Sequence, residues 1–413
     1  MNLPISTRYA VRSLGRHFRR TLLSVIGIGV GCGVCLFMVS FVRGEGEMMM
    51  RAAAESGAGH LRVVPERWRE TREKDLRLEH WQSTLAELRD MDVFKAVAPR
   101  ARTEALLAFG TRTTGAEMVG VDSHVEPVLN RLVRDVSKGR YLQPGDRGKV
   151  VVGRAVAERL DVEVGDDLMV TVSGKGDEMR SDMVTIVGLV STGSKMLDAS
   201  ICQVTLPEIE ELTGYEGAGE LTMLLKDSDL LSSVVRRVKD RVSDGATVMT
   251  WDEIMPELAA GVEVDETWTK LMVGLIILMV FLGIASAQLT AVLERRREFA
   301  VLSALGMKGS QLVRVMFAEG IVLGLLGTAT AILFGVPAAW ALATWGLDFT
   351  ALYGDMDLAV SNILIDPIIY GDFGWWLVPL ALGLSLTATV LSSLYPAWYA
   401  VRTDPAEALR VER

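Results

Sequence analysis

The apolar residues of this chain gather into four long stretches separated by polar segments. A helix needs about 20 mostly apolar residues to cross a bilayer, and each stretch reaches that length; the last contains no charged residue. The pattern predicts an integral membrane protein whose transmembrane helices cover residues 22–42, 271–292, 315–345 and 373–401.

The segment between the first two stretches has a different pattern. Its periodicity switches several times between the alternation of a strand and the repeat of a helix, which is typical of a mixed α/β domain. With 223 residues, from 44 to 266, it is long enough for a core of its own, arranged as two lobes. We therefore expect an α-helical membrane protein with four transmembrane helices and a large mixed α/β domain inserted between helices 1 and 2. The expected strands are 60–64, 149–152, 168–172 and 183–190, the last two forming a hairpin, and the expected helices are 82–91, 154–160 and 230–242.

Residues 45–55 prolong the first apolar stretch outward. They are rich in Met and Ala, contain no Pro and have no Gly after Gly46, so they favour a helix. We expect the first transmembrane helix to continue as a stalk into the external domain, and the second to have a similar extension.

Lys and Arg mark one side of the membrane. They cluster before the first span, between the second and third, and after the fourth, whereas the 346–372 segment has five Asp and no Lys or Arg. Because positive residues accumulate in cytoplasmic segments, both termini are predicted to be cytoplasmic and the large domain external. The expected organisation is the N-terminus with the first helix (1–43), external domain (44–266), second helix (267–293), cytoplasmic segment (294–314), third helix (315–345), external loop (346–372), fourth helix (373–395) and cytoplasmic tail (396–413).

Composition and charge agree with this topology. Half of the residues are hydrophobic, which disfavours a soluble protein. The 44–266 segment carries a net charge of −13 and the remainder +4. An acidic external face is usually a solvated surface, and it does not favour nucleic acid as a partner. The basic start before an apolar run also suggests a signal peptide, but the run is too long and no small-x-small cleavage site follows it directly, so a retained helix is the favoured interpretation.

The sequence lacks the usual motifs for nucleotide binding, metal binding and proton relay. It has no G-x-x-x-x-G-K-[ST] phosphate loop and no metal-binding spacing among its four His. Lys270 and Glu319 lie at span edges rather than in a proton relay; Glu319 could contact a partner, but a carboxylate facing water or an Arg is the favoured interpretation. Cys32 and Cys35 have C-x-x-C spacing inside an apolar helix, where small packing residues are a better interpretation than redox or metal ligands. We expect a non-catalytic subunit that binds no cofactor or metal itself.

Alternating glycines distinguish the first span. The pairs 27/31 and 29/33 each have the G-x-x-x-G spacing that lets a second helix approach closely. The alternative is that these glycines are merely tolerated on a lipid-facing helix. The expected helix-packing residues are Gly27, Gly29, Gly31 and Gly33.

A short charged segment links the second and third spans. Residues 294–309 read Glu-Arg-Arg-Arg-Glu-Phe-Ala-Val-Leu-Ser-Ala-Leu-Gly-Met-Lys-Gly. Phe299, Leu302 and Leu305 recur every three positions and predict a short helix with one narrow apolar stripe, which Gly306 is suited to end. The three arginines stay solvated or meet acidic partners.

The order of one span, a large external domain and three further spans resembles the ABC transporter permeases of the MacB/FtsX-like superfamily. Residues 294–307 are similar to the cytoplasmic coupling helix of that superfamily. Residues 394–410, Leu-Tyr-Pro-Ala-Trp-Tyr-Ala-Val-Arg-Thr-Asp-Pro-Ala-Glu-Ala-Leu-Arg, are similar to its cytoplasmic end. The resemblance implies that a separate cytoplasmic ATPase dimer binds ATP and Mg, moves the coupling helices and so drives the external domains. The ATPase-coupling residues that it implies are Glu294, Arg296, Glu298, Phe299, Leu302, Leu305, Gly306 and Met307.

Within the superfamily the lipoprotein-releasing permeases, of the LolC/LolE type, resemble this chain best. Residues 56–63 are similar to the start of their external domain, and residues 185–200 to a later strand and loop. The macrolide exporter carries a fused ATPase, and the cell-division regulator has a much smaller external domain. One feature differs, because residues 173–182 form a short loop without Pro where one lipoprotein-releasing subunit has a proline-containing hook for a periplasmic chaperone. A periplasmic chaperone is therefore an open partner.

The resemblance implies an inner-membrane subunit that extracts lipoproteins from the outer leaflet, paired with a second permease that is identical or homologous. The alternatives are export of small molecules or peptides with a periplasmic adaptor, FtsX-like signalling to a periplasmic hydrolase, and a receptor without an ATPase. Cargo acyl chains would enter between the outer halves of the first two spans of paired subunits. From their expected depth, the cleft residues are Phe37, Phe41, Met48, Leu271 and Leu275.

Overall fold

The computed structural model describes most of the chain. Its described residues are 18–68, 76–134, 136–242, 245–294, 301, 307–350, 359–360, 363–364 and 366–402. The described residues fall into two compact units, one within the ranges 18–45, 263–347 and 369–402, the other within the ranges 46–262 and 348–368. We describe each unit by itself.

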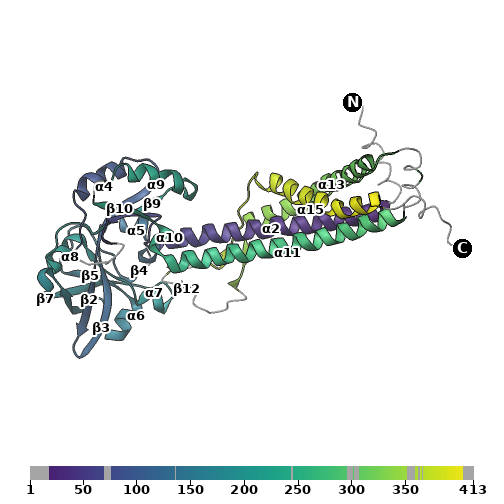
Figure 1. The fold of residues 1–413 in the computed structure, drawn as a ribbon. Coiled ribbons are helices and arrows are strands. Elements are labelled where there is room, and N and C mark those ends of the chain that lie inside the picture. Colours follow the sequence, from purple (N-terminus) through teal and green to yellow (C-terminus); the bar gives the residue numbers. More distant parts are fainter. Residues whose placement is uncertain are drawn as a thin grey trace. The chain divides into compact units, whose positions relative to one another are not determined.

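Four helices in the described chain are long and apolar enough to cross a membrane, which confirms the predicted fold class. Each is longer than a bilayer requires, and the first and second run past the predicted spans into the segments expected to be helical extensions. They are α2 (Phe18–Glu55), α11 (Pro256–Glu294), α13 (Gly309–Trp345) and α15 (Leu377–Arg402), shown in Figure 1.

Helices α13 and α15 pack through a row of small residues. Thr328 and Ser385 share a hydrogen bond between their hydroxyl groups. A side chain added at Gly324 would lie 2.6 Å from Thr389 Oγ1, and one added at Gly320 would overlap Ser393 Oγ. Small residues spaced by four allow transmembrane helices to approach closely. This interface was not predicted, although Gly320, Gly324 and Thr328 have the same four-residue spacing as the glycines of the first span.

The other unit holds the predicted α/β domain. Hydrogen bonding joins β2 to β3, β3 to β8, β8 to β5, β5 to β7, β7 to β6 and β6 to β2, which closes a ring of six strands. Where the strands are paired on both sides, closure removes free sheet edges. The ring strands are β2 (Phe94–Phe109), β3 (Arg112–Val121), β5 (Lys149–Gly153), β6 (Asp167–Ser173), β7 (Met179–Val190) and β8 (Cys202–Thr205), and β4 (Val136–Gly139) pairs with β7.

A second lobe extends from the first half of β2. The strand order there is β10, β1, β9, β2, and helices α4 and α9 lie beside these strands (Figure 1). Its elements are β1 (Leu61–Pro65), α4 (Trp81–Arg89), β9 (Glu220–Leu225), α9 (Leu231–Lys239) and β10 (Ala246–Thr250). The remaining short helices are α5 (Glu126–Leu129), η1 (Arg131–Val133), α6 (Arg154–Leu160), η2 (Lys175–Asp177), α7 (Lys195–Asp198), α8 (Leu206–Thr213), η3 (Ser228–Leu230) and α10 (Trp251–Ile254).

Each lobe has its own hydrophobic core. Alternate residues of β6 and β7, such as Leu168, Val170 and Val184, point into the ring with apolar residues of α6 and α8. Leu88 of α4 and Val234 of α9 belong to the core of the second lobe. The alternation that predicted the β6–β7 hairpin is therefore the pattern of a strand with one buried face. The long β2–β3 hairpin was not predicted, and β7 begins at Met179, inside the segment expected to be a loop.

The segment between α13 and α15 contains short strand pairs. β11 (Leu347–Asp348) pairs with β14 (Ile368–Ile369), and β12 (Ala359–Val360) with β13 (Ile363–Leu364). Asp366 forms an ion pair with Arg131 of the α/β domain, at 3.2 Å. Part of this predicted loop thus packs with the large domain.

Candidate functional site

The α/β domain holds the end of α2 through buried arginines. Gly57 and Ala58 lie just after α2, which ends at Glu55, and their carbonyl groups accept from buried arginines. Arg62 Nε donates to Ala58 O at 2.7 Å, Arg62 Nη2 to Gly57 O at 3.2 Å, and Arg100 Nη1 also donates to Gly57 O. Carbonyl groups at a helix C-terminus need such donors, and cations are favourable there. The end of the predicted stalk is therefore fastened to strands β1 and β2.

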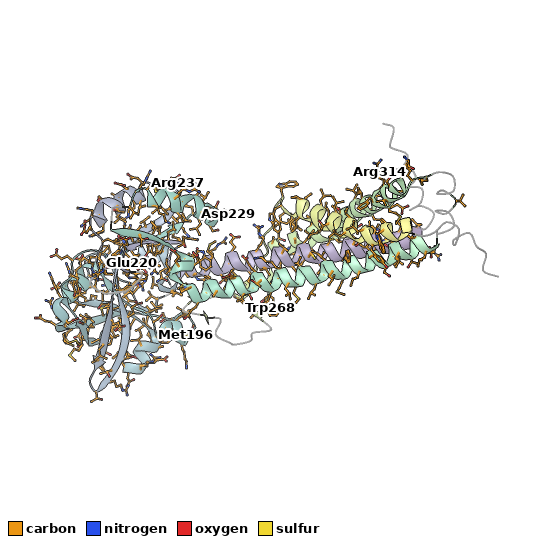
Figure 2. All side chains as sticks on the ribbon, in the orientation of Figure 1. Met196, Glu220, Asp229, Arg237, Trp268 and Arg314 are labelled. Carbon is orange, nitrogen blue, oxygen red and sulfur yellow. The ribbon has the colours of Figure 1, made fainter. Side chains whose placement is uncertain are left out.

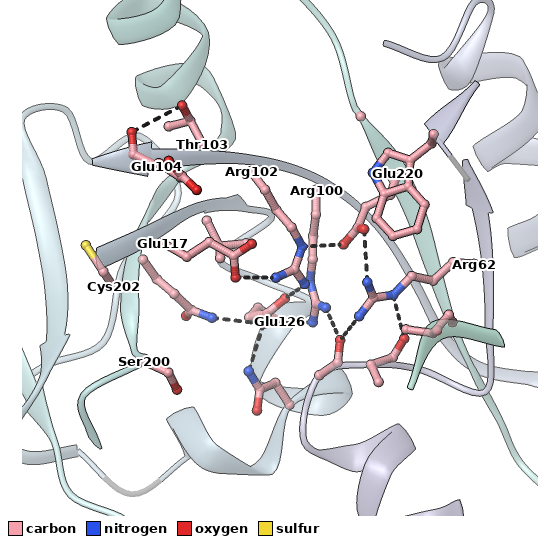
Figure 3. Close-up of a pocket in the computed structure, with 18 of the residues that line it drawn as sticks. Arg62, Arg100, Arg102, Thr103, Glu104, Glu117, Glu126, Ser200, Cys202 and Glu220 are labelled. Atoms are coloured by element: carbon pink, nitrogen blue, oxygen red, sulfur yellow. Dashed lines mark hydrogen bonds and ion pairs between the residues drawn. The ribbon is translucent and has the colours of Figure 1, made fainter. Parts of the chain in front are cut away.

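A buried charge network of Arg62, Arg100, Arg102, Glu126 and Glu220 surrounds this fastening (Figure 3). Arg100 makes a two-pronged pair with Glu126, at 2.8 and 2.9 Å, and both side chains are essentially inaccessible. Glu220 accepts from Arg62 at 3.2 Å and from Arg102 at 3.1 Å. A bidentate pair fixes the relative orientation of its two side chains. Loss of one partner from a buried pair is costly, because it leaves an isolated buried charge. Glu126 also accepts from Asn130 and Gln203.

Strand register brings the network together. Arg62 lies opposite Thr222, and Arg100 lies opposite Glu220, so β1, β9 and β2 present these side chains on one sheet face. Burial alone would raise the pKa of Glu220, but Arg102 and Arg62 outweigh it and lower that pKa to about 2. Burial lowers the pKa of Arg62 to about 10 despite Glu220. The pair is therefore ionised at neutral pH.

The network lines a polar cavity of about 1030 Å³ at the end of α2. Its wall also includes Ser56, Glu104, Glu117, Cys202 and Tyr215. Charged groups share this lining with apolar residues such as Val119, Leu132 and Ile201, so an acyl chain there would still remove water from charged groups without giving them a partner. The described part of the chain contains no cluster of His, Cys, Asp and Glu that could hold a metal ion. The cavity is thus suited to water around the stalk end.

His60, at the start of β1, makes the stability of the domain depend on pH. Its Nδ1 accepts from the Leu225 N–H at 3.2 Å, and Nε2 has no partner in the described chain. Burial and then the Arg51 charge lower the pKa of His60 to about 4. Below pH 6.5 the unfolded chain binds a proton that the folded chain rejects until about pH 4. We therefore expect the free energy of unfolding to fall as the pH decreases from 6.5 toward 4, by up to about 1.4 kcal/mol per pH unit.

Urea unfolding at pH 7 and pH 5 measures this effect. His60→Gln keeps an acceptor for Leu225 but removes the titration, so the difference between the two pH values should shrink. His124→Gln, at an exposed His, is the control and should behave like the wild type. Equal pH dependence in all three proteins would contradict the assignment to His60.

The predicted ATPase-coupling residues are only partly described. Glu294 is exposed at the end of α11, and Met307 packs near Val292, Met316 and Ala397. The contacts of Met307 join the end of the predicted coupling helix to α11, α13 and α15. Arg296, Glu298, Phe299, Leu302, Leu305 and Gly306 lie outside the described residues.

The predicted cleft residues remain a prediction. Phe37 and Phe41 are half-buried on α2, whereas Leu271 and Leu275 are about half exposed on α11. Their neighbour on α11, Trp268, is exposed as well (Figure 2). Met48 belongs to the unit that contains the α/β domain.

The glycines of the first span face different neighbours. A side chain at Gly29 would overlap Thr330 of α13, and the Cβ of one at Gly33 would lie 3.6 Å from Gly335 Cα. One at Gly31 would overlap Val280 of α11, while Gly27 has open space. The 29/33 pair therefore lies against α13, and Gly31 lies against α11.

A polar contact that was not predicted holds α2 near residue 43. Arg43 Nε lies 2.9 Å from Asp372 Oδ2, and its guanidinium lies 4.3 Å from the centre of the Trp376 ring. Ser40 Oγ donates to Asp372 O at 2.8 Å. Such charge and cation–π contacts tie α2 to the segment that precedes α15. The only sequence signal was the acidic 346–372 segment, whose partner could not be identified from the sequence.

The sequence is similar to two protein families and to several known membrane proteins. The MacB-like periplasmic core domain family matches residues 21–241, and the FtsX-like permease C-terminal family matches residues 270–405. The chain is 25% identical to the lipoprotein-releasing system transmembrane protein LolC of Xylella fastidiosa, over 99% of both proteins. It is 22% identical to the corresponding protein LolE of Haemophilus influenzae, over 94% of this chain and 93% of the relative. It is also 24% identical to the macrolide export ATP-binding/permease protein MacB of Hyphomonas neptunium, over 98% of this chain and 61% of that relative.

Proposed function

We propose that this chain, which belongs to the family with the MacB-like periplasmic core domain and the FtsX-like permease C-terminal region, is the transmembrane subunit of an ATP-driven complex that extracts lipoproteins from the outer leaflet of the inner membrane. Its family is the one that the sequence predicted. The chain is an ABC transporter permease of the LolC/LolE type, and the cargo and energy source are the parts that we propose.

The observation that carries the proposal is similarity along the entire chain to proteins named for lipoprotein release. The MacB relative is matched over only 61% of its length, and its name includes ATP binding. In our proposal a separate cytoplasmic ATPase dimer binds ATP and Mg, and a second permease completes the membrane part. Extraction needs an energy source, because each acyl CH₂ removed from the membrane costs about 0.8 kcal/mol.

The proposed transmission begins at the cytoplasmic end of α11. Movement of residues 294–307 would shift α11, and movement of α2 would reach the α/β domain through Gly57 and Ala58. The bonds from Arg62 and Arg100 to those carbonyl groups support this step, because they leave the end of α2 little freedom within the domain. The charged residues in the cavity lining disfavour a route for acyl chains through this part of the α/β domain.

Reconstitution tests the proposed function. The chain, its partner permease and the ATPase are placed in proteoliposomes with a triacylated protein, and ATP-dependent release into solution is measured. Release that requires both ATP and the acyl groups supports extraction. Turnover of ATP without release, together with ATP-dependent export of a small molecule, would instead support MacB-like export, which the similarity to MacB favours as the second candidate.

Charge reversal in the predicted coupling segment gives a sharper result. Arg296→Glu, combined with Glu294→Lys and Glu298→Lys, should abolish co-purification of the ATPase and reduce release at least about ten-fold, equivalent to about 1.4 kcal/mol of lost interaction. The control is Lys138→Glu, in an exposed ion pair of the α/β domain, which should retain ATPase binding. Full release by the triple variant, without bound ATPase, would favour a receptor that needs no ATPase.

A further inference from the structure

Gln288 is an unusual residue within the helical unit. It lies on α11 and is only 7% exposed. Its amide oxygen and nitrogen are both buried, and neither has a hydrogen-bond partner in the part of the chain that the structure describes. Buried polar groups in proteins are nearly always paired, and in a transmembrane helix a polar residue is by default a functional candidate.

The neighbours of Gln288 on α11 show which surface it faces. Ile284 and Val292 lie one turn before and after it on the same face of the helix, and both are buried. Ile284 packs in a cluster with Leu323 of α13 and Ala388 of α15, whereas Val292 packs with Met316 of α13 and Ala397 of α15. Gln288 therefore lies between two levels at which α11 contacts the α13/α15 pair.

Polar side chains occupy the same interval of α13 and α15. Glu319 is 8% exposed, and Ser392 and Ser393 are fully buried; we call these three residues the buried polar cluster. The two serine hydroxyls donate to backbone carbonyl groups of their own helix, and Ser392 also donates to Phe281 O of α11, at 3.0 Å. Their oxygen atoms keep lone pairs that can accept from an amide. The hydroxyl oxygens of Ser392 and Ser393 are thus possible acceptors at the level of the Gln288 amide, which has no partner among the described residues.

We propose that Gln288 is a positioning residue that holds α11 in two alternative arrangements against α13 and α15. In the arrangement seen here its carboxamide is unpaired. In the second, a small shift of α11 lets it hydrogen-bond to the buried polar cluster. Shifts of this size at packed helix interfaces are a common element of two-state transitions. Helix α11 ends at Glu294, the first of the predicted coupling residues, so we expect the shift to affect ATP hydrolysis by the complex. Only this expected effect on ATP hydrolysis rests on the proposed function.

The first test needs only the purified full-length chain in detergent. Gln288→Met keeps the side-chain length and removes the hydrogen-bonding groups, so it should suppress the second arrangement. We expect amide hydrogen exchange in residues 284–292 to slow about ten-fold, because one lost hydrogen bond shifts a two-state population by about that factor, with an unchanged or higher unfolding temperature. The matched control is Thr290→Val: Thr290 is exposed on the same helix and bonds to Ser286 O of that helix. Its exchange should equal that of the wild type.

The second test uses the complex with its ATPase. Gln288→Met should lower the maximal rate of ATP hydrolysis about ten-fold and leave the KM for ATP unchanged, whereas Gln288→Asn, which keeps the carboxamide, should retain most of the rate. A structural role predicts the opposite order, because Met preserves the packing volume and Asn does not. The inference is overturned if Gln288→Met exchanges and turns over like the wild type, or if Asn loses as much activity as Met. If the wild-type chain binds no ATPase, the proposed function fails, while the exchange measurement still decides the role of Gln288.

Discussion

Replacing Glu126 by Gln is expected to lower the free energy of unfolding of the α/β domain by about 3–5 kcal/mol, because it leaves the Arg100 guanidinium buried without a counter-charge. The side chains of this pair are 1% and 0% exposed, and Arg100 donates to both oxygens of Glu126. The amide nitrogen introduced by Glu126→Gln would replace one of the two accepting oxygens and would present its N–H groups to the N–H groups of Arg100. Because Arg100 also holds Gly57 O, we further expect faster hydrogen exchange at the end of α2.

Urea unfolding of the detergent-solubilised full chain, followed by tryptophan fluorescence, measures this loss. The control is Glu211→Gln, since Glu211 pairs with Arg147 at 3.3 Å with both side chains more than half exposed, and such pairs contribute less than about 1 kcal/mol. The double variant Arg100→Met with Glu126→Leu should recover part of the stability, because no unpaired charge remains. Equal effects of Glu126→Gln and Glu211→Gln would contradict the assigned role of the network.

Replacing Gly335 by Leu should separate α2 from α13 and cost about 3 kcal/mol or more, the upper range for overpacking a close contact. A Cβ at this position would lie 2.8 Å from Gly33 Cα and 3.1 Å from Leu36 Cδ1. The first of these neighbours is backbone, which cannot rotate away as a side chain can. The helices must therefore move apart, and the contacts of Leu36 with Ala339 and Ala381 are lost with them.

Gly274→Leu is the matched control for this substitution. Gly274 is a glycine of a spanning helix, and a side chain added there meets nothing within 4 Å. Its effect on the unfolding of the purified chain, titrated with sodium dodecyl sulfate, should stay within about 0.5 kcal/mol. Comparable losses for Gly335→Leu and Gly274→Leu would show that the cost comes from replacing glycine in a helix and not from the contact between α2 and α13.

The membrane-spanning helices could be predicted because their signal is local. The length and apolarity of a segment decide whether it can cross a bilayer, and neither depends on its neighbours in the fold. The hairpin of β6 and β7 was predicted for the same reason, since alternation along one strand reports one buried face. The β2–β3 hairpin was missed because Arg100, Arg102 and Glu104 suggest a solvated polar segment, whereas in the structure Arg100 is buried.

The candidate site was much less predictable. Arg62, Arg100 and Glu220 are separated by up to 158 residues, and each, taken alone, is an ordinary charged residue of an acidic domain. The four-residue spacing of Gly320 and Gly324 could have been noticed, as it was for Gly29 and Gly33. Even so, spacing gives a possible contact face and not the helix that occupies it: Gly31 faces α11, and Gly27 meets nothing among the residues that the structure describes.

The amino-acid sequence by itself determined that four helices can span a membrane and that a large α/β domain lies between the first two, because hydrophobic length and periodicity act over neighbouring residues. Family membership was readable for a similar reason, since the order of segments and the motifs at 294–307 and 394–410 are properties of the chain. Only the tertiary structure decided that Arg100 is buried against Glu126, that it holds the end of α2, and that Gln288 has no hydrogen-bond partner in the described part of the chain. Burial and pairing depend on strand register and helix packing, which bring together groups that are far apart along the chain.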